Sequence, residues 1–347
     1  MRIDLFDYEL PGERIAQTAR PRGSSRLLTL DRTTGAIAHR SFHDFPDLLH
    51  AGDLLVRNDV RVRKARLYGR DEKDRVVEIF LLRGDAADPR RWAALARPGR
   101  RAKKGRLLRF GEDLTATVDE VEADGRRRVT FGRAVDDSLL ERIGNVPLPP
   151  YIRRAAGTPD FPADREAYQT IYAREPLAVA APTAGLHFTS SVLERIAARG
   201  CRIADLTLAV GAGTFKPVTS EDTAGHRLDA EEARIPPLTL RLVAETKERG
   251  GRVVAVGTTV TRALEAAARA EPGPAVGDLV FSTDLFITPG FEFRAVDALL
   301  TNFHLPRSTL LMLVSAFGGR ERVLAAYEEA VREKYLFYSY GDAMFMS

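Results

Sequence analysis

One change of pattern constrains how this chain can fold. In residues 1–62 and again after residue 149, strand-length apolar runs alternate with helix-length segments, as they do in α/β domains. Between residues 63 and 148, short apolar runs follow one another with only turns between them, which favours a small antiparallel barrel. We therefore predict an α/β domain with a mixed sheet, residues 1–62 and 149–347, into which a β-barrel domain, residues 63–148, is inserted.

The expected elements follow from these apolar runs and the turns between them. A hairpin is expected at residues 26–30 and 36–40, a short helix at 45–50 and a buried strand at 54–56. Ser191 and Glu194 have the spacing of a capping box, which predicts a helix over about residues 191–199. The aromatic tail, residues 335–340, could stack on bases, but a packed final strand is the stronger expectation. Further helices are expected at 238–249, 261–268, 309–316 and 320–334, and barrel strands at 76–82, 92–96, 107–110, 114–118 and 129–131.

Composition excludes several classes of protein. Hydrophobic residues make up 44% of the 347 residues, enough for a buried core, and charged residues make up 29% with both signs mixed. The single cysteine, Cys201, excludes a disulfide scaffold and a cysteine-based zinc or iron–sulfur site within one chain. No apolar run reaches the length of about 18 residues that a membrane span needs, and acidic residues interrupt the first residues too early for a signal peptide. We expect a cytoplasmic protein.

The net charge of +4 conceals an uneven distribution. Residues 61–133 hold 21 lysines and arginines against 12 acidic residues, a net charge of +9, whereas the rest of the chain has a net charge of −5. Binding to a phosphate backbone needs such a basic surface, although a solvated face without a partner can have the same composition. The candidate nucleic-acid-binding residues form two clusters, the first of Arg61, Arg63 and Lys64 and the second of Arg100, Arg101, Lys103 and Lys104.

Three expected strand-to-helix loops are rich in small and hydroxyl residues. They cover residues 181–189, residues 211–215, and residues 257–259 with Arg262 one turn into the following helix. In open α/β sheets, ligands bind beyond the carboxyl ends of the strands, where glycine lets the backbone approach a ligand closely. Ordinary tight turns have the same composition. The second loop does not match the dinucleotide fingerprint, because its third glycine and following helix are missing.

Histidines and carboxylates supply the candidate acid–base groups. His187 and His304 lie in loops of this kind, which favours acid–base or substrate-binding roles, whereas His39, His43 and His50 are expected to be structural. His226, Asp229 and Glu231 could form a metal site or an acid–base set. No paired-histidine helix spacing supports a metal, and we expect none.

The same loops belong to longer strings that are typical of one family. Ala-Pro-Thr-Ala-Gly-Leu-His-Phe-Thr at residues 181–189 and Thr-Asn-Phe-His-Leu-Pro at residues 301–306 are the most specific. On these strings the chain resembles the S-adenosylmethionine:tRNA ribosyltransferase-isomerases of queuosine biosynthesis. Matching stretches run from end to end: 7–17, 25–28, 58–67, 147–152, 168–173, 180–189, 211–215, 256–265, 283–287, 301–313 and 339–344.

The resemblance implies a reaction, a fold and partners. Members of this family transfer the ribosyl part of S-adenosylmethionine to 7-aminomethyl-7-deazaguanine at the wobble position of a tRNA anticodon. They isomerise the ribose, which gives epoxyqueuosine, and release adenine and methionine. The family fold is an α/β catalytic domain with an inserted β-barrel. We accordingly expect S-adenosylmethionine as ribosyl donor, tRNA as partner, no membrane and a monomer.

The reaction that the resemblance implies needs a general base and acid in a polar pocket poor in water, because the sulfonium acidifies the adjacent C5′ protons. His187 and His304 are the candidates, with Asp297 and Glu231 behind them. The residues expected to hold the donor and its ribose are Thr183, Gly185, Gly211, Gly213, Thr214, Thr258, Thr259 and Arg262.

The chain departs from the family pattern near this expected site. Where the family usually shows His-x-Met-His-x-Glu, residues 226–231 have Asp229 in place of the second histidine. Two alternatives follow: a diverged paralogue that uses S-adenosylmethionine on another acceptor, or a non-catalytic RNA-binding relative. Retention of His187, His304, Thr258 and Asp342 favours an enzyme.

Overall fold

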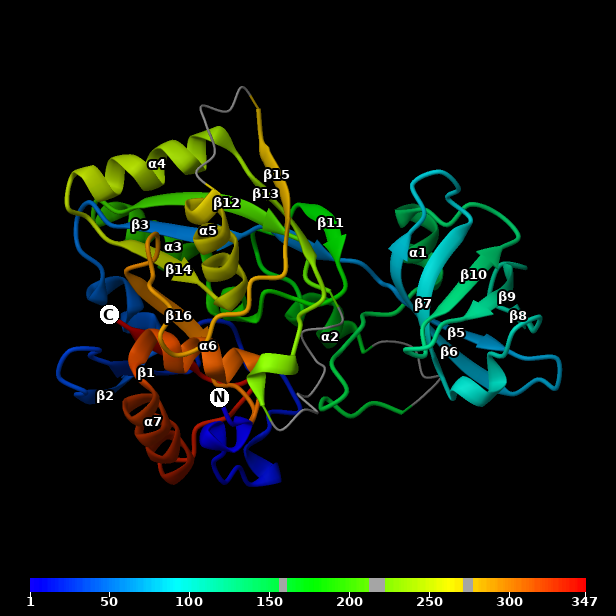
Figure 1. Ribbon diagram of the computed structural model, residues 1–347, viewed down its shortest axis with the longest axis horizontal. Helices are drawn as coiled ribbons and strands as arrows, with labels where there is room; N and C mark the ends of the chain where they lie inside the picture. Colours follow the sequence, from blue (N-terminus) through cyan, green and yellow to red (C-terminus); the bar gives the residue numbers. More distant parts are fainter. Residues whose placement is uncertain (156–160, 212–221, 271–276) are drawn as a thin grey trace. The chain divides into compact units, whose positions relative to one another are not determined.

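The computed structural model describes residues 1–155, 161–211, 222–270 and 277–347 (Figure 1). The chain divides into two compact units. The sheet unit comprises Met1–Val60, Gln169–Glu175 and Pro182–Ser347, and the barrel unit comprises Arg61–Tyr168 and Pro176–Ala181. Each unit has its own sheet and its own buried core, so each is described by itself.

The sheet unit is built on a mixed sheet that has nine strands in the described residues, in the order β15-β13-β12-β3-β14-β16-β17-β1-β2 (Figure 1). The four central strands β12, β3, β14 and β16 run parallel. Strand β13 is antiparallel to β12, and β17 is antiparallel to β16 but parallel to β1. The bounds are β1 Arg26–Leu30, β2 Ile37–Ser41, β3 Leu54–Asn58, β12 Arg202–Leu208, β13 Glu231–Ile235, β14 Val253–Val256, β15 Leu279–Thr283, β16 Ala298–Asn302 and β17 Ala343–Met346.

Short and long helices pack against this sheet. The long ones are α3 (Ser190–Ala198), α4 (Pro237–Glu248), α5 (Thr258–Ala270), α6 (Thr309–Gly318) and α7 (Arg320–Arg332). Every residue of β3 and β14 is buried, as expected for parallel strands that are covered on both faces. Among the described residues of this unit, the 3-10 helices are η1 (Ile3–Phe6), η2 (Gly12–Arg14), η3 (Phe42–Leu48), η5 (Thr183–His187) and η7 (Thr223–Gly225).

An aromatic core joins the loop before α3 to the sheet. Phe188 packs edge to face against Phe42 and Phe45 of η3 at centroid distances of 5.2 and 5.9 Å, and Phe45 packs against Phe345 of β17 at 5.2 Å. These rings belong to one cluster of buried residues with Leu55, Val254 and Leu300 of the central strands. Burial of this apolar surface fixes the position of the loop that contains His187.

The barrel unit contains a closed antiparallel barrel with strand order β10-β7-β6-β5-β8-β9. Its strands are β5 (Arg66–Arg70), β6 (Val76–Gly84), β7 (Arg91–Arg97), β8 (Leu107–Arg109), β9 (Thr115–Val121) and β10 (Arg127–Phe131). Closure leaves no strand edge of the barrel unpaired. The unit also contains η4 (Gly99–Arg101), α1 (Asp137–Ile143) and α2 (Pro162–Ala167). Strands β4 (Val60–Val62) and β11 (Glu175–Ala178) pair with each other, and each begins with the last residue of a sheet-unit segment.

The predicted fold class, a mixed-sheet α/β unit with a small antiparallel barrel, is confirmed, but three local predictions were wrong. The N-cap of α3 is Thr189, whose side chain accepts a hydrogen bond from the backbone of Val192, so Ser191 and Glu194 lie inside the helix and form no capping box. The aromatic tail is buried but is no strand, because Tyr338 has a left-handed φ of 73°; the final strand is β17. Strand β5 was missed because its outward residues are arginines and a tyrosine.

Candidate functional site

Four parallel strands bring their carboxyl ends together at one edge of the sheet, called here the carboxyl edge. Small or polar residues follow each strand: Asn58 ends β3, Gly211 follows β12, Thr258 follows β14 and His304 follows β16. This is the edge at which ligands bind in open α/β sheets. The carboxyl edge is therefore the candidate site of the sheet unit.

A buried ion pair joins two of these loops. Because β13 is antiparallel to β12, Glu231 at the start of β13 lies at the carboxyl edge. Its Oε2 accepts a hydrogen bond from Nη1 of Arg262 at 2.6 Å, and its Oε1 accepts one from the backbone N–H of Gly211 at 2.8 Å. Arg262 also donates through Nε to the carbonyl of Leu285 at 3.0 Å. Glu231 was expected behind the proton carriers; since both of its oxygens hold other groups, the geometry favours an anchoring role.

A hollow opens beside this ion pair, and its lining combines charged and apolar side chains. Asp229, Glu231 and Arg262 form the polar part, whereas residues 285–287 and the first turns of α6 form the apolar part. An apolar wall with a few placed polar groups is the usual lining of a small-molecule site. Asp229, which replaces the expected histidine, thus belongs to the same hollow as Arg262. The full lining is Leu228, Asp229, Glu231, Arg262, Leu285, Phe286, Ile287, Thr309, Leu310 and Leu313.

His187 is buried in the loop before α3. Its Nδ1 lies 2.8 Å from Oγ of Ser25, and its ring packs against Phe42 with centroids 5.1 Å apart. Burial lowers the pKa of His187 to about 4, and the Arg22 guanidinium acts in the same direction. The imidazole is therefore neutral at pH 7 and is able to accept a proton there.

His304 is buried just beyond the end of β16. Its Nε2 lies 3.0 Å from Oγ1 of Thr301, and its backbone N–H donates to the hydroxyl of Tyr327 at 3.2 Å. Burial lowers its pKa to about 3, so this imidazole too is neutral at pH 7. The two histidines lie near the same strand end, because η5, which contains His187, packs against β16.

The glycine and threonine residues predicted to hold a donor have clear places in the described structure. Gly185 lies in η5, where a Cβ would overlap the hydroxyl of Tyr172 and come within 2.8 Å of Cγ2 of Thr170, so a larger residue does not fit. Thr258 is buried and Thr259 half-buried in the first turn of α5. Gly257 before them has a φ of 93°, which favours glycine. Thr183 begins η5, and Gly213 and Thr214 lie outside the described residues.

Asp297 does not join the other predicted catalytic residues. It precedes β16, so it lies at the opposite edge of the sheet, beside the start of β14. Its Oδ2 accepts a hydrogen bond from the backbone of Val253 at 2.8 Å, and its Oδ1 accepts one from Nζ of Lys247 at 2.6 Å. The geometry gives Asp297 a role in ordering the amino ends of two strands.

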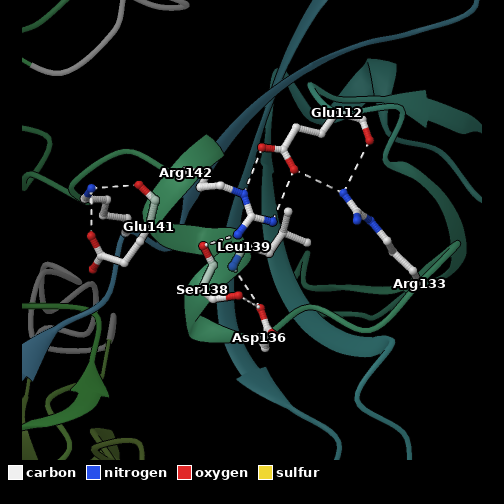
Figure 2. A network of polar contacts seen from close by, with 8 residues as sticks. Glu112, Arg133, Asp136, Ser138, Leu139, Glu141 and Arg142 are labelled. Atoms are coloured by element: carbon white, nitrogen blue, oxygen red, sulfur yellow. Dashed lines mark hydrogen bonds and ion pairs between the residues drawn. The ribbon is translucent and has the colours of Figure 1, made fainter.

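The first basic cluster, in the barrel unit, is largely neutralised by α1. Arg63 pairs with Asp137 at 2.9 Å, and Lys64 and Arg61 pair with Glu141 at 2.8 and 3.2 Å. Figure 2 shows α1 with Glu141 on one side and, on the other, Arg142 held by Glu112 at 2.9 Å. Arg133 also contacts Glu112, and Asp136 caps the helix through the N–H of Leu139 at 2.8 Å.

The second basic cluster differs in its exposure. Arg100, Lys103 and Lys104 are exposed at η4 and in the turn after it, and within the described part of the chain no carboxylate lies at ion-pair distance from them. Arg101 is half-buried and donates through Nη1 to the carbonyl of Val76 at 2.7 Å. Three of these four predicted side chains are thus presented to solvent with their charge available.

Sequence reasoning missed several polar residues that shape the carboxyl edge. Oδ1 of Asn58 accepts a hydrogen bond from the backbone N–H of Leu208 at 3.1 Å, which links β3 to the end of β12. Ser25 contacts His187, and Tyr172 packs on Gly185. Each lies in one of the strings that carry the resemblance, and that was the signal available for them.

Metal binding and membrane crossing each need a recognisable structural feature. In residues 1–155, 161–211, 222–270 and 277–347, no group of three histidine, cysteine or carboxylate side chains is arranged to hold a metal ion. In the same residues no helix has the length and apolar character that crossing a bilayer requires.

The fold and the candidate site together define the class of protein. It is an α/β protein that has a candidate ligand site at the carboxyl edge of its sheet and a basic barrel as a second unit. The model of the queuosine biosynthesis protein family matches residues 3–346. The chain is 51% identical to the S-adenosylmethionine:tRNA ribosyltransferase-isomerase of an Anaeromyxobacter species, over 100% of this chain and 99% of that protein. It is 49% identical to the enzyme of the same name from Heliobacterium modesticaldum, over 99% of both chains.

A solved structure gives the same result. The crystal structure of an S-adenosylmethionine tRNA ribosyltransferase from Thermotoga maritima matches with a TM-score of 0.57 and 40% identity, covering 99% of this chain and 100% of that one. The chain therefore belongs to the queuosine biosynthesis protein family, which confirms the family predicted from the sequence.

The buried histidines predict an acid-dependent loss of stability. His304 takes up its proton near pH 6.5 when unfolded but only near pH 3 when folded, so unfolding becomes more favourable as the pH falls below about 6.5. This histidine alone can contribute up to about 1.4 kcal/mol per pH unit to the free energy of unfolding. Urea unfolding of wild type and His304→Gln between pH 7 and 4 should show a shallower pH dependence in the variant.

The matched control for this experiment is His43→Gln, at an exposed position. It should leave the pH dependence of the unfolding free energy as in wild type. Equal slopes for His304→Gln and wild type would show that His304 is protonated alike in both states.

Proposed function

We propose that this chain is an S-adenosylmethionine:tRNA ribosyltransferase-isomerase that acts on 7-aminomethyl-7-deazaguanine at the wobble position of tRNA. The product is epoxyqueuosine, and adenine and methionine are released. The observation that carries the proposal is the match over the full length to enzymes of this name, at about half of all positions. The protein is then an enzyme of tRNA modification, with S-adenosylmethionine as its ribosyl donor.

The carboxyl edge supports the donor site. The loop of Gly185 leaves no space for a side chain, Gly211 is anchored by Glu231, and Thr258 and Thr259 open α5. The hydroxyls and N–H groups of such loops suit the ribose and carboxylate of a donor. Bound there, the donor would supply an electrophilic sulfonium; the chain would supply proton acceptors in a site poor in water.

The neutral histidines fit the role of proton acceptor. With pKa values near 4 and 3, His187 and His304 hold a free nitrogen lone pair at pH 7. Asp297 is not retained in the proposed catalytic set, because it lies at the other edge of the sheet. Glu231 is retained as an anchor that positions Arg262 and Gly211.

The barrel supports an RNA-binding role. Its exposed cations Arg100, Lys103 and Lys104 suit phosphate contacts, and Arg61, Arg63 and Lys64 could join only if phosphates replaced Asp137 and Glu141. We further propose that residues 63–148 act as a domain of their own, that the enzyme is a monomer, that it works in the cytoplasm and that it needs no metal.

Asp229 favours one alternative, a paralogue that uses the same donor on another acceptor. The residue lines the hollow beside Arg262, so a change from histidine to a carboxylate alters the site directly. A carboxylate oxygen accepts hydrogen bonds, whereas an imidazole both donates and accepts them, so the exchange changes which groups of an acceptor the site can bind.

One assay distinguishes these functions. The protein is incubated with S-adenosylmethionine and tRNA bearing the aminomethyl-deazaguanine, and the digested tRNA is analysed by mass spectrometry. The expected result is epoxyqueuosine with an equal amount of free adenine, made by wild type and by Asp229→His but not by Asp229→Ala. No turnover by wild type together with turnover by Asp229→His would favour the paralogue.

The exposed basic cluster predicts a salt-dependent contribution to tRNA binding. Replacing Arg100, Lys103 and Lys104 by alanine should weaken binding and lower the slope of log affinity against log salt by roughly 0.7–0.9 for each phosphate that is no longer neutralised. Binding isotherms at several salt concentrations measure this slope.

The matched control removes three exposed cations from the sheet unit: Arg40 in β2, and Arg241 and Arg249 in and after α4. It should leave the slope near that of wild type. A slope that drops equally in both triple variants would place the RNA contacts outside the second cluster.

A further inference from the structure

Four stretches that carry the family resemblance meet around one buried histidine. Ser25 precedes β1, Asn302 ends β16, and residues 170–172 pack against Gly185 in the loop that contains His187. These stretches are far apart in the sequence, and each contributes polar atoms to a place that is otherwise walled by Phe42 and Phe188. A polar cluster in such surroundings must satisfy its hydrogen bonds or carry out chemistry.

The Asn302 amide has a defined orientation. Its Nδ2 donates to the backbone carbonyl of Tyr338 at 3.0 Å, so Oδ1 is the atom left for another neighbour. This Oδ1 and Nε2 of His187 are both buried, and neither has a hydrogen-bond partner with good geometry among the described residues. Because η5 packs against β16, which ends at Asn302, the two unpartnered atoms lie in the same buried region, and the Asn302 side chain favours the protonated form of the His187 ring.

This orientation determines which ring nitrogen carries the proton. An acceptor oxygen near Nε2 favours the tautomer with hydrogen on Nε2, since a lone pair there would face the Oδ1 lone pairs. Nδ1 then holds the free lone pair and accepts the hydroxyl hydrogen of Ser25 across 2.8 Å. The hydroxyl of Ser25, the imidazole of His187 and the amide of Asn302 thus follow one another in space, and each group orients the next.

We propose that Ser25, His187 and Asn302 form a proton relay that serves the transfer reaction. The hydroxyl of Ser25 passes its proton to Nδ1 of His187 as its oxygen takes up a proton from the carbon beside the sulfonium of the donor, and the electron pair of the broken C–H bond stays on that carbon, next to the positive sulfur. The ring becomes an imidazolium, whose Nε2–H is stabilised by Oδ1 of Asn302. This inference rests on the proposed function and adds Ser25 as the proton acceptor and Asn302 as a positioning residue.

The surroundings of His187 suit a proton acceptor that stays uncharged between turnovers. The Phe42 ring covers it from η3, and Arg22 is the charged group that acts on it, in the direction that disfavours protonation. Arg22 itself donates to the carbonyl of Leu186 at 3.0 Å, so its position is tied to the same loop. The ring therefore rests in its neutral form across the neutral pH range.

The tautomer can be tested without any activity. Nitrogen NMR of protein labelled with ¹⁵N-histidine, with His187→Asn to assign the signals, should show His187 protonated at Nε2 and bare at Nδ1. A ring protonated at Nδ1 would overturn the proposal, because Ser25 would then lack an acceptor for its proton.

Ser25→Ala tests the hydroxyl, with Ser24→Ala as matched control. Ser24 is exposed, and its Oγ donates to the carbonyl of Pro21 at 2.6 Å, without a contact to His187. In single-turnover assays Ser25→Ala should lower the rate about 10²-fold or more with donor affinity near that of wild type, as expected for loss of one acid–base group. Ser25→Cys, which keeps an exchangeable proton, should recover part of the rate. Equal rates for the two alanine variants would overturn the relay.

Asn302→Asp tests the amide through a readout that a structural role would not move. A carboxylate facing Nε2 favours the imidazolium, so the acidic limb of the pH–rate profile should shift to higher pH. A folded Asn302→Asp variant with an unshifted limb contradicts the relay. Absence of turnover by wild type on the modified tRNA would instead contradict the proposed function, while the NMR result would still decide the tautomer.

Discussion

The ion pair between Glu231 and Arg262 is the contact on which the candidate site depends. It links the start of β13 to Arg262, one turn into α5, and the same carboxylate holds the backbone of Gly211 just beyond the end of β12. Both side chains are buried, at 5% and 6% exposure, so removing either one would leave an unpaired charge inside the protein. Three loops at the carboxyl edge are therefore held in one arrangement, and the hollow with Asp229 lies beside it.

Around this anchor the site is polar but contains neutral acid–base groups. His187 and His304 are uncharged at pH 7 because burial destabilises the protonated ring more than the neighbouring groups stabilise it. The aromatic packing of Phe42, Phe45 and Phe188 that buries His187 is the same packing that attaches its loop to the sheet. Fold stability and the neutral state of His187 thus depend on the same rings, whereas the exposed cations of the barrel contribute charge without burial.

The sequence predicted much of the fold, because strand and helix periods and glycine-rich turns are local signals. It also found the loops at the carboxyl edge, since their small residues stand directly after apolar strands. It did not reveal that Glu231 and Arg262 pair, because a contact across 31 positions depends on the antiparallel return of β13. The prediction placed Asp297 among the catalytic residues. Asp297 comes before β16, however, and a residue before a parallel strand lies at the opposite edge of the sheet from the ligand site. The N-cap of α3 is Thr189 and not the predicted Ser191, because the end of a helix depends on backbone angles as well as on the spacing of capping residues in the sequence.

We propose that the donor binds at the carboxyl edge anchored by Glu231 and Arg262. A crystal structure of the protein with S-adenosylmethionine bound tests this most directly. We expect density for the donor beyond the carboxyl ends of β12, β14 and β16, in contact with the loops of Gly185 and Thr258. Density at the opposite edge beside Asp297, or in the barrel unit, would contradict it.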